Sequence, residues 1–348
     1  KTTCIGAYPK PDYVDLPDWF NHHDGPDATD PAERWSGAMN ALGDDAESII
    51  SRGVQEVIAD QVEAGIDIPT DGEVPRENYI HYHCRHIKGI DFGVLTEVSL
   101  RNGAYSARLP TVNGPVSARN IFLVRDWKRA QGCTDRPIKI TIPGPMTITD
   151  TTADAYYDNA ERLGAKLADA LNREVIALAE AGCSNIQVDE PLFARNPAAA
   201  LDYGFENLER TFHRCPKNVI RTVHMCCGYP DRLDNPDYPK ADLDSYNKLA
   251  DAIEYSSIMA VSFEDAHRHN DLSLLDRFNQ THVILGVIAV AKSKVESVGE
   301  IRDRLVSALE HIDADRLLAA PDCGLGLLSR ELARLKLANM CEAVRTIG

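Results

Sequence analysis

Eight short apolar, β-rich segments alternate with amphipathic helical patterns, and this alternation constrains the fold more than any other feature. The clearest helical pattern spans residues 154–181, where apolar residues recur at steps of three or four and Gly182 supplies a stop signal. Similar patterns occupy residues 293–312 and 329–347. The β-rich segments are residues 3–8, 66–73, 138–145, 185–191, 219–227, 257–264, 283–290 and 317–323. Eight strand–helix repeats predict an α/β fold, a (β/α)8 TIM barrel.

The length of 348 residues suits a barrel of about 250 residues that carries insertions. Two extended loops are expected, residues 9–43 after the first strand and residues 79–136 after the second, the latter with a turn-rich stretch at 102–117. Long loops on this face of a barrel usually wall a pocket. No linker, low-complexity tract or repeat is visible, so we expect one domain over residues 1–348.

Composition excludes several classes of protein. The hydrophobic fraction of 44% is ordinary for a globular enzyme, and no apolar run approaches the ~20 residues of a membrane span. A net charge of −16 argues against a nucleic-acid partner. Nine cysteines, odd in number and unevenly spaced, do not resemble a disulfide scaffold. The first 20 residues have no signal-peptide core, so we expect a cytoplasmic protein without a membrane partner.

Polar residues gather at the carboxyl ends of the predicted strands, where the active sites of barrels lie. The segment ends carry Ala7, Glu73, Asp189, Glu190, His224, Cys226, Glu264 and Cys323. Because these ends meet at one rim, we expect the ionisable side chains to converge there.

His224, Cys226, Glu264 and Cys323 together form a complete zinc ligand set. Alternate residues of a strand point the same way, so His224 and Cys226 should face one side. A mixed nitrogen and sulfur set favours Zn²⁺ over Mg²⁺ or Ca²⁺. By itself, His-x-Cys is more often a core histidine beside a buried thiol. Placement at successive strand ends, about a hundred residues apart from first to last, instead predicts a catalytic metal site.

Several motifs resemble the catalytic barrel of the cobalamin-independent methionine synthase family. They are Asp71-Gly72-Glu73, Ile142-Pro143-Gly144-Pro145-Met146-Thr147, Gln187-Val188-Asp189-Glu190-Pro191, His224-Met225-Cys226, Glu264 and Pro321-Asp322-Cys323-Gly324. The resemblance covers essentially the whole chain. It is to the short, single-barrel members, which include zinc-dependent epoxyalkane:coenzyme M transferases and methionine synthases that take methyl groups from a corrinoid.

The resemblance implies that the four candidate ligands hold Zn²⁺, which favours the thiolate form of a bound substrate thiol. It also implies that Glu73 and Asp189 bind the amino group of homocysteine. Other interpretations stay open at this point. Glu73 could cap a loop or pair with Arg76, and Asp189 with Glu190 could be a buried carboxylate pair bonded to barrel amides.

Four positions depart from the family pattern. Ala7 replaces a serine that contacts the amino acid, and Thr151 replaces a tryptophan that stacks on folate. Ala289 and Ala291 replace an aspartate and a histidine associated with protonating the leaving group. These losses make a methylated folate a doubtful donor. They favour a leaving group that needs no proton, from a corrinoid protein, methylcobalamin or a sulfonium.

The sequence therefore predicts a zinc-dependent methyltransferase that moves a methyl group to a small thiol, with homocysteine as the default acceptor. The alternative is alkyl transfer or a lyase reaction on another thiol such as coenzyme M. A sulfonate would need a cation near the pocket, for which Lys10, Arg76 and Arg268 are the candidates. A third interpretation is a non-catalytic zinc or ligand-binding barrel.

Overall fold

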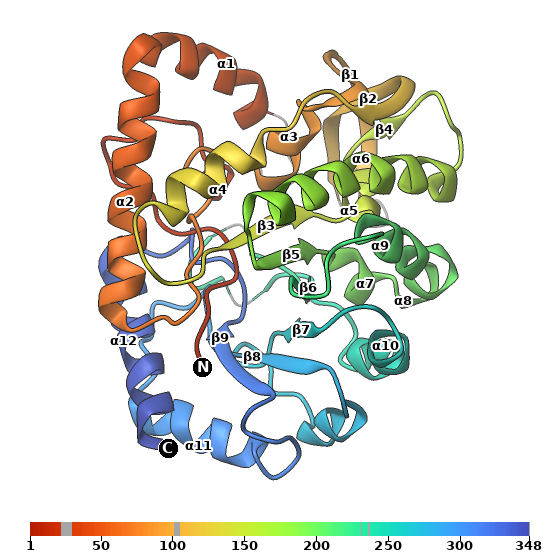
Figure 1. Ribbon diagram of the computed structural model, residues 1–348. Coiled ribbons are helices and arrows are strands. Elements are labelled where there is room, and N and C mark those ends of the chain that lie inside the picture. Colours follow the sequence, from red (N-terminus) through yellow and green to blue (C-terminus); the bar gives the residue numbers. More distant parts are fainter. Residues whose placement is uncertain (22–29, 101–104, 231, 236, 348) are drawn as a thin grey trace.

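The computed structural model describes residues 1–21, 30–100, 105–230, 232–235 and 237–347, and its centre is a parallel six-stranded sheet (Figure 1). The strand order is β3-β5-β6-β7-β8-β9. The strands are β3 (Lys139–Pro143), β5 (Asn185–Asp189), β6 (Ile220–Met225), β7 (Ala260–Phe263), β8 (His282–Ile288) and β9 (Leu317–Pro321). All five pairings between neighbouring strands are parallel, so the carboxyl ends of the six strands lie at one edge.

Two N-terminal segments close this sheet into a barrel. Thr2 bridges β9 at Ala319, Thr3 bridges Ile68, and Thr70 bridges β3 at Lys139, all in parallel. The predicted (β/α)8 barrel is therefore confirmed.

The prediction of full strands at residues 3–8 and 66–73 was wrong, because these segments form only isolated bridges. Pro69 has no amide hydrogen for a strand ladder. The carbonyls of Ile5 and Gly6 instead accept hydrogen bonds from the side chains of Gln187 (2.8 Å) and Thr70 (2.8 Å). Side chains thus replace the missing ladder at this part of the ring.

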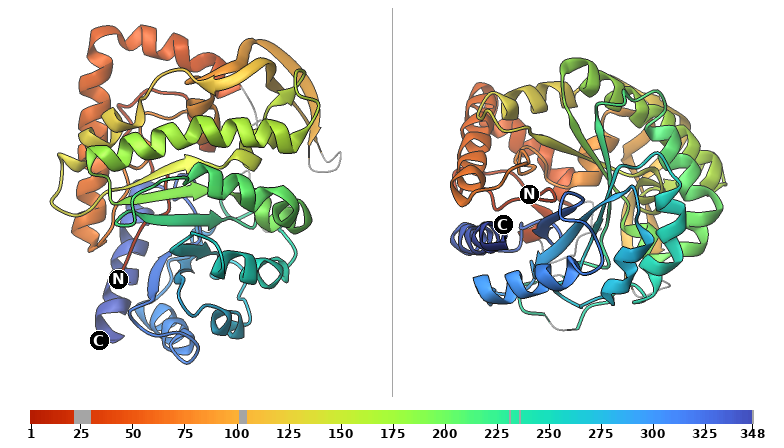
Figure 2. Two further views of the ribbon diagram at one scale, coloured as in Figure 1. Left: turned by 45° about the vertical axis from the view of Figure 1, so that its right-hand side comes forward. Right: turned by 60° about the horizontal axis from the view of Figure 1, so that its bottom comes forward.

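Helices cover the outside of the barrel in both views of Figure 2. The main ones are α2 (Ala46–Ala64), α4 (Leu123–Gln131), α6 (Ala160–Ala181), α9 (Phe205–Thr211), α10 (Ser245–Glu254), α11 (Val298–Ala308) and α12 (Arg330–Ile347). Shorter elements are α5 (Pro145–Asp150), α7 (Pro191–Arg195), α8 (Pro197–Ala199), the π-helical turn η4 (Ala200–Gly204) and the 3₁₀ turn η5 (Leu272–Arg277). None of the described helices combines the length and apolar character needed to cross a bilayer.

Local signals in the sequence set the helix ends. The Asn159 side chain accepts a hydrogen bond from the Arg162 amide (2.8 Å) and begins α6, six residues later than the pattern predicted. Gly182 ends α6 with a φ of 105°, a left-handed conformation that glycine adopts without strain. Ser297 and Glu300 form a capping box at the start of α11.

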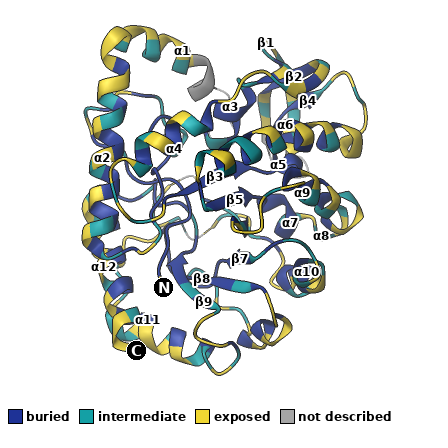
Figure 3. Cartoon of the chain, viewed as in Figure 1, coloured by how far each residue is buried: buried dark blue, intermediate teal, exposed yellow. Residues whose placement is uncertain are grey.

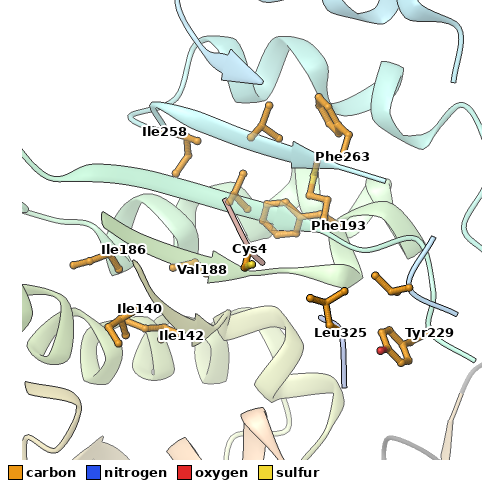
Figure 4. Packing of buried hydrophobic residues seen from close by; sticks show 14 of the residues in the cluster. Cys4, Ile140, Ile142, Ile186, Val188, Phe193, Tyr229, Ile258, Phe263 and Leu325 are labelled. Atoms are coloured by element: carbon orange, nitrogen blue, oxygen red, sulfur yellow. The ribbon is translucent and has the colours of Figure 1, made fainter. Parts of the chain in front are cut away.

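The core lies between the strands and the helix faces turned toward them (Figure 3). Every residue of β3 and β5 is buried, as expected for parallel strands covered on both faces. Figure 4 shows part of this cluster, with Ile140 and Ile142 from β3, Ile186 and Val188 from β5, and Phe263 from β7.

Both predicted insertions are present. The first contains the 3₁₀ turn η1 (Trp19–Asn21), α1 (Asp30–Leu42) and the 3₁₀ turn η2 (Gly43–Asp45), and its residues 22–29 lie outside the described part of the chain. The second contains α3 (Tyr79–Cys84) and a long antiparallel hairpin of β1 (Ile87–Leu100) and β2 (Tyr105–Ala118), with β4 (Ala153–Asp154) beside β2.

The expectation of turns over residues 102–117 was wrong from residue 105 onward, and residues 102–104 lie outside the described part. The register of the hairpin shifts after Lys88 and after Asp91, so the glycines and prolines that suggested turns belong to a bulged strand pair. Gly89 has a φ of 89°, and a Cβ there would lie 2.7 Å from the Gly114 oxygen.

The side chain of Leu167 on α6 is fully buried, so its substitution tests how α6 packs against the core. Leu167→Ala should lower the free energy of unfolding by about 2–5 kcal/mol, because it leaves a cavity as well as losing apolar contact. Chemical denaturation measures this difference. Leu335→Ala on α12, where the side chain is exposed, should change it by less than about 0.5 kcal/mol. Equal effects of the two substitutions would contradict the position of α6.

Candidate metal and substrate site

Strand register brings the predicted site residues to one end of the barrel. Pairing places Pro143 beside Asp189, Asp189 beside His224, and His224 beside Ser262 across four neighbouring strands. These positions lie at or near the carboxyl ends of β3, β5, β6 and β7. A cavity of about 80 Å³ opens there, enough for several water molecules or a small substrate. Its wall includes Ala7, Glu73, Asp189, His224, Cys226 and Cys323.

Three of the four predicted metal ligands converge. Ligand atoms of His224, Cys226 and Cys323 all lie within 4.8 Å of one another. The Nδ1 atom of His224 is 3.0 Å from the Ser262 hydroxyl, whereas its Nε2 atom is buried and has no hydrogen-bond partner. Burial lowers the pKa of His224 to about 3, so the ring is neutral and can donate an electron pair. A buried nitrogen without a partner, beside two thiols, fits a zinc site.

The two thiols are chemically coupled. The pKa of Cys226 lies well above its usual range, first because of a hydrogen bond with Cys323 and then because of burial. Thiols in such surroundings stay protonated unless a positive charge is supplied. A divalent cation would supply it.

Glu264, the fourth predicted ligand, lies beside this group and not within it. One carboxylate oxygen accepts a hydrogen bond from the Cys227 amide (3.1 Å), and a hydrogen bond with Glu264 also affects the pKa of Cys226. Burial raises the pKa of Glu264 well above its usual value. Its carboxylate lies within 4.8 Å of ligand atoms of His267 and Asp322, a second cluster that the sequence did not predict.

Asp322 organises the loop that follows β7. Its carboxylate accepts hydrogen bonds from the amides of Asp265 (2.9 Å), Ala266 (2.9 Å) and His267 (2.7 Å), and from Nδ1 of His267 (2.7 Å). Burial opposes ionisation of Asp322, but the bonds and charge of His267 outweigh it and hold the pKa below its usual value. Asp322 precedes Cys323 after β9, and Asp265 follows Glu264 after β7, so this network connects the loops that carry Glu264 and Cys323.

The positions that depart from the family pattern are all buried. The Thr151 hydroxyl donates a hydrogen bond to the Thr147 carbonyl (2.8 Å). Ala289 and Ala291 are also buried, but an imidazole lies beside Ala291, because Nε2 of His267 accepts a hydrogen bond from the Ala291 amide (3.1 Å). Both nitrogens of that ring have partners, so His267 orders the loop.

The two carboxylates expected to bind an amino group share the cavity wall. Glu73 has a φ of 55°, and its carboxylate accepts hydrogen bonds from the Thr141 hydroxyl (2.6 Å) and from Arg76 (3.3 Å). A non-glycine residue in this left-handed conformation carries backbone strain, which surrounding contacts must hold in place. The sequence left open whether Glu73 pairs with Arg76. The two side chains do pair, and Glu73 also lines the cavity.

The Asp189 carboxylate accepts a hydrogen bond from the Gln187 side-chain amide (2.7 Å). Burial, together with the charge of Glu73, raises the pKa of Asp189 well above the usual value. Glu190 does not line the cavity. It accepts hydrogen bonds from the Met146 amide and from the amide and hydroxyl of Thr147, as a buried carboxylate bonded to barrel amides would. The two adjacent carboxylates thus have different surroundings.

Sequence reasoning missed the aromatic wall of the cavity. Trp19, Phe20, Tyr79 and Tyr229 line it, with ring centroids of neighbouring pairs 4.3–5.9 Å apart. Trp19 and Phe20 come from the first insertion and Tyr79 from the second, the two long loops expected to wall a pocket, but nothing in the sequence indicated that their rings would meet.

The cation in the cavity wall is not one of the three candidates. Lys10, Arg76 and Arg268 are absent from the described lining of the cavity, while Arg195, the last residue of α7, is part of it. No motif marked Arg195, because its position depends on how α7 packs at the end of β5.

Known proteins resemble this chain over nearly its whole length. A methionine synthase of Saccharolobus solfataricus is 29% identical over 99% of this chain and 94% of its own length. One of Sulfolobus acidocaldarius is 28% identical over 97% and 89%. The structure of a B12-independent methionine synthase from Shewanella sp. W3-18-1, in complex with selenomethionine, has a TM-score of 0.86 and 30% identity over 99% of this chain and 97% of its own.

A putative vitamin-B12 independent methionine synthase from Listeria monocytogenes has a TM-score of 0.72 over 99% of this chain and 96% of its own, and at 18% identity it supports the fold alone. The family described as the cobalamin-independent synthase catalytic domain matches residues 27–210 and 242–346. That description argues against the corrinoid protein or methylcobalamin that the sequence left open as donor. The match spans most of the chain, which therefore belongs to the family of cobalamin-independent synthase catalytic domains.

Proposed function

We propose that this protein is a zinc-dependent S-methyltransferase that moves a methyl group to the thiol of homocysteine and yields methionine. One observation carries the proposal: His224, Cys226 and Cys323 converge within 4.8 Å, and the buried Nε2 of His224 has no hydrogen-bond partner. The proposal assigns residues 1–348 to one zinc-binding barrel domain. It places that domain in the cytoplasm, a reducing compartment in which Cys226 and Cys323 stay thiols.

In this proposal His224, Cys226 and Cys323 hold Zn²⁺, and Glu264 is the fourth ligand or the residue that Zn²⁺ releases most easily. When bound, the ion lowers the pKa of a substrate thiol and so supplies a thiolate near neutral pH. Ser262 orients the imidazole through its contact with Nδ1. Asp322 holds the loop that carries Glu264.

The acceptor's ammonium group would lie toward Asp189 and Glu73. Both carboxylates are buried in the cavity wall, and burial raises the pKa of each. A cation placed beside them favours their ionised form, so binding of an ammonium group offsets part of the cost of burial. Trp19, Phe20 and Tyr229 cover the cavity with apolar surface and limit the access of water.

The transfer forms one bond and breaks one. The thiol releases its proton, a sulfur lone pair forms the bond to the methyl carbon, and the electron pair of the broken bond leaves with the donor remnant. We propose a donor other than a methylated folate. Thr151 bonds to the backbone and offers no ring for a pterin to stack on, and both nitrogens of His267 already have partners. A sulfonium, which leaves as a neutral sulfide, needs no acid.

Alkyl transfer to a thiol that bears a sulfonate, such as coenzyme M, is the second candidate. Arg195 in the cavity wall favours it, since a guanidinium can pair with a sulfonate. The methyl group of Ala7, which cannot form a hydrogen bond, is compatible with either acceptor.

A thiol competition assay tests the function. The zinc-loaded protein is supplied with homocysteine and coenzyme M together, and with either methyltetrahydrofolate or a methyl sulfonium, and products are identified by mass spectrometry. We expect methionine from the sulfonium reaction. Methylated coenzyme M as the sole product would establish the second candidate, and robust turnover with methyltetrahydrofolate would refute the proposed donor class.

The ligand assignment is tested by elemental analysis of purified variants. His224→Ala, Cys226→Ser and Cys323→Ser should each lose the bound zinc, because three ligands from the protein are the minimum of a catalytic site. Glu264→Gln should retain more zinc than these three. The control Cys133→Ser, which changes an exposed thiol, should bind as much zinc as the unmodified protein. Full zinc content in Cys226→Ser would exclude the proposed site.

Asp322→Asn tests the loop network. The substitution keeps the size of the side chain but removes the charge and one acceptor, which should raise the dissociation constant of zinc about 10–100-fold and lower the free energy of unfolding by about 1.5–3 kcal/mol. Titration against a chelator and chemical denaturation measure the two effects. Asp303→Asn, on the exposed face of α11, is the matched control. Unchanged zinc affinity in Asp322→Asn would mean that the loop does not position the ligands.

A further inference from the structure

One cation in the wall of the cavity has no hydrogen-bond or ion-pair partner among the described residues. Arg195 lines the cavity together with Asp189, Glu73 and His224, and carries the only permanent positive charge in its described lining. Its Nε atom is buried and has no hydrogen-bond partner. A buried N–H without an acceptor is costly, and such groups usually have a partner that completes them.

The three cations that the sequence offered as candidates have partners. Lys139, whose buried Nζ atom has no hydrogen-bond partner, does not line the cavity. Lys10 donates a hydrogen bond to the Arg76 carbonyl (2.6 Å) and pairs with Asp18 (3.3 Å). Arg76 is bonded to Thr141 and Glu73, and Arg268 donates to the Ala241 carbonyl (2.8 Å). These three side chains have definite roles within the fold.

The carboxylate closest to Arg195 in the sequence does not neutralise it. Glu190 lies directly before α7, the helix that ends at Arg195. The two carboxylate oxygens of Glu190 accept three hydrogen bonds from Met146 and Thr147. Burial raises the pKa of Glu190 to about 7, and the charge of Arg195 acts in the opposite direction, but no hydrogen bond or ion pair joins the two side chains. The guanidinium therefore remains available for a ligand that enters the cavity.

Packing fixes α7, and with it the backbone from which the Arg195 side chain extends. Pro191 begins the helix directly after β5, and the Phe193 side chain is fully buried against Phe205, with ring centroids 4.8 Å apart. The Asn196 amide closes the turn on the Leu192 carbonyl (2.7 Å). A short, anchored connection thus joins Asp189 at the end of β5 to Arg195, and both line one cavity.

We propose that Arg195 binds the acid group of the acceptor thiol, while Asp189 and Glu73 face its ammonium group. This inference rests on the proposed function and names the substrate class of the same site: a small thiol that carries an anion. An α-amino acid presents opposite charges on one carbon, so its pocket needs opposite charges close together. The cavity wall has them, and arginine's planar fork suits a carboxylate or a sulfonate.

The test measures thiol binding apart from turnover. Cobalt(II) takes the place of zinc, and its visible spectrum reports a thiol that joins the metal. Three probes are titrated: homocysteine, homocysteine amide, which lacks the negative charge, and 2-mercaptoethanesulfonate. They are compared in the unmodified protein, Arg195→Gln, Arg195→Lys and the control Arg210→Gln, whose side chain lies exposed on α9. Circular dichroism checks folding, and Arg195→Lys covers the case in which Arg195→Gln does not fold.

We expect the dissociation constant of homocysteine to rise about 10–100-fold in Arg195→Gln, the range of a charge-assisted hydrogen bond. Affinity for the amide should stay within about twofold, and Arg195→Lys should recover part of the loss. If only 2-mercaptoethanesulfonate binding were weakened in this way, the role of Arg195 would stand, and the acceptor would be a sulfonate thiol instead of homocysteine.

Equal weakening of homocysteine and its amide, or no change in either, would overturn the role of Arg195 while the proposed function stands. If none of the three thiols altered the spectrum of the unmodified protein, the proposed function would fail, and the inference with it.

Discussion

Parallel pairing of the strands is the constraint on which the rest of this structure depends. In a closed parallel ring every strand delivers its carboxyl end to the same rim, so side chains far apart in the sequence meet without a local motif. The register of β5, β6 and β7 places Asp189, His224 and Ser262 side by side. Cys323, just beyond β9, lies close to His224 and Cys226.

Burial gives this rim its chemistry. Water is largely excluded, so His224 is neutral, and Asp189 and Glu264 have raised pKa values. Groups in such surroundings interact strongly with any charge that enters. Residues that do not line the cavity hold these groups in place: the Ser262 hydroxyl contacts Nδ1 of His224, the Gln187 amide donates to Asp189, and the Cys227 amide donates to Glu264.

The polarity of the cavity also narrows the choice of substrate. Carboxylates and one guanidinium occupy the same small space, under an aromatic cover. This combination suits a small zwitterion or a small anion with a thiol. On the donor side, Thr151 is bonded into the backbone, and His267 takes up the space next to Ala291 with both nitrogens engaged. Under the proposed function, the cavity therefore has more groups that can bind the acceptor than groups that can protonate a leaving group.

The sequence by itself determined the barrel, its two insertions and the residues at the strand ends, because hydrophobic periodicity and side-chain alternation are local properties. It could not determine that residues 3–8 and 66–73 would form bridges only, since that depends on hydrogen bonds from Gln187 and Thr70 across the barrel. Only the tertiary structure decided that Glu264 lies beside the other three candidate ligands, that Asp322 orders the loop, and that Arg195 reaches the cavity while Lys10 does not. Each of these depends on contacts between residues distant in the chain, and no local pattern encodes such contacts.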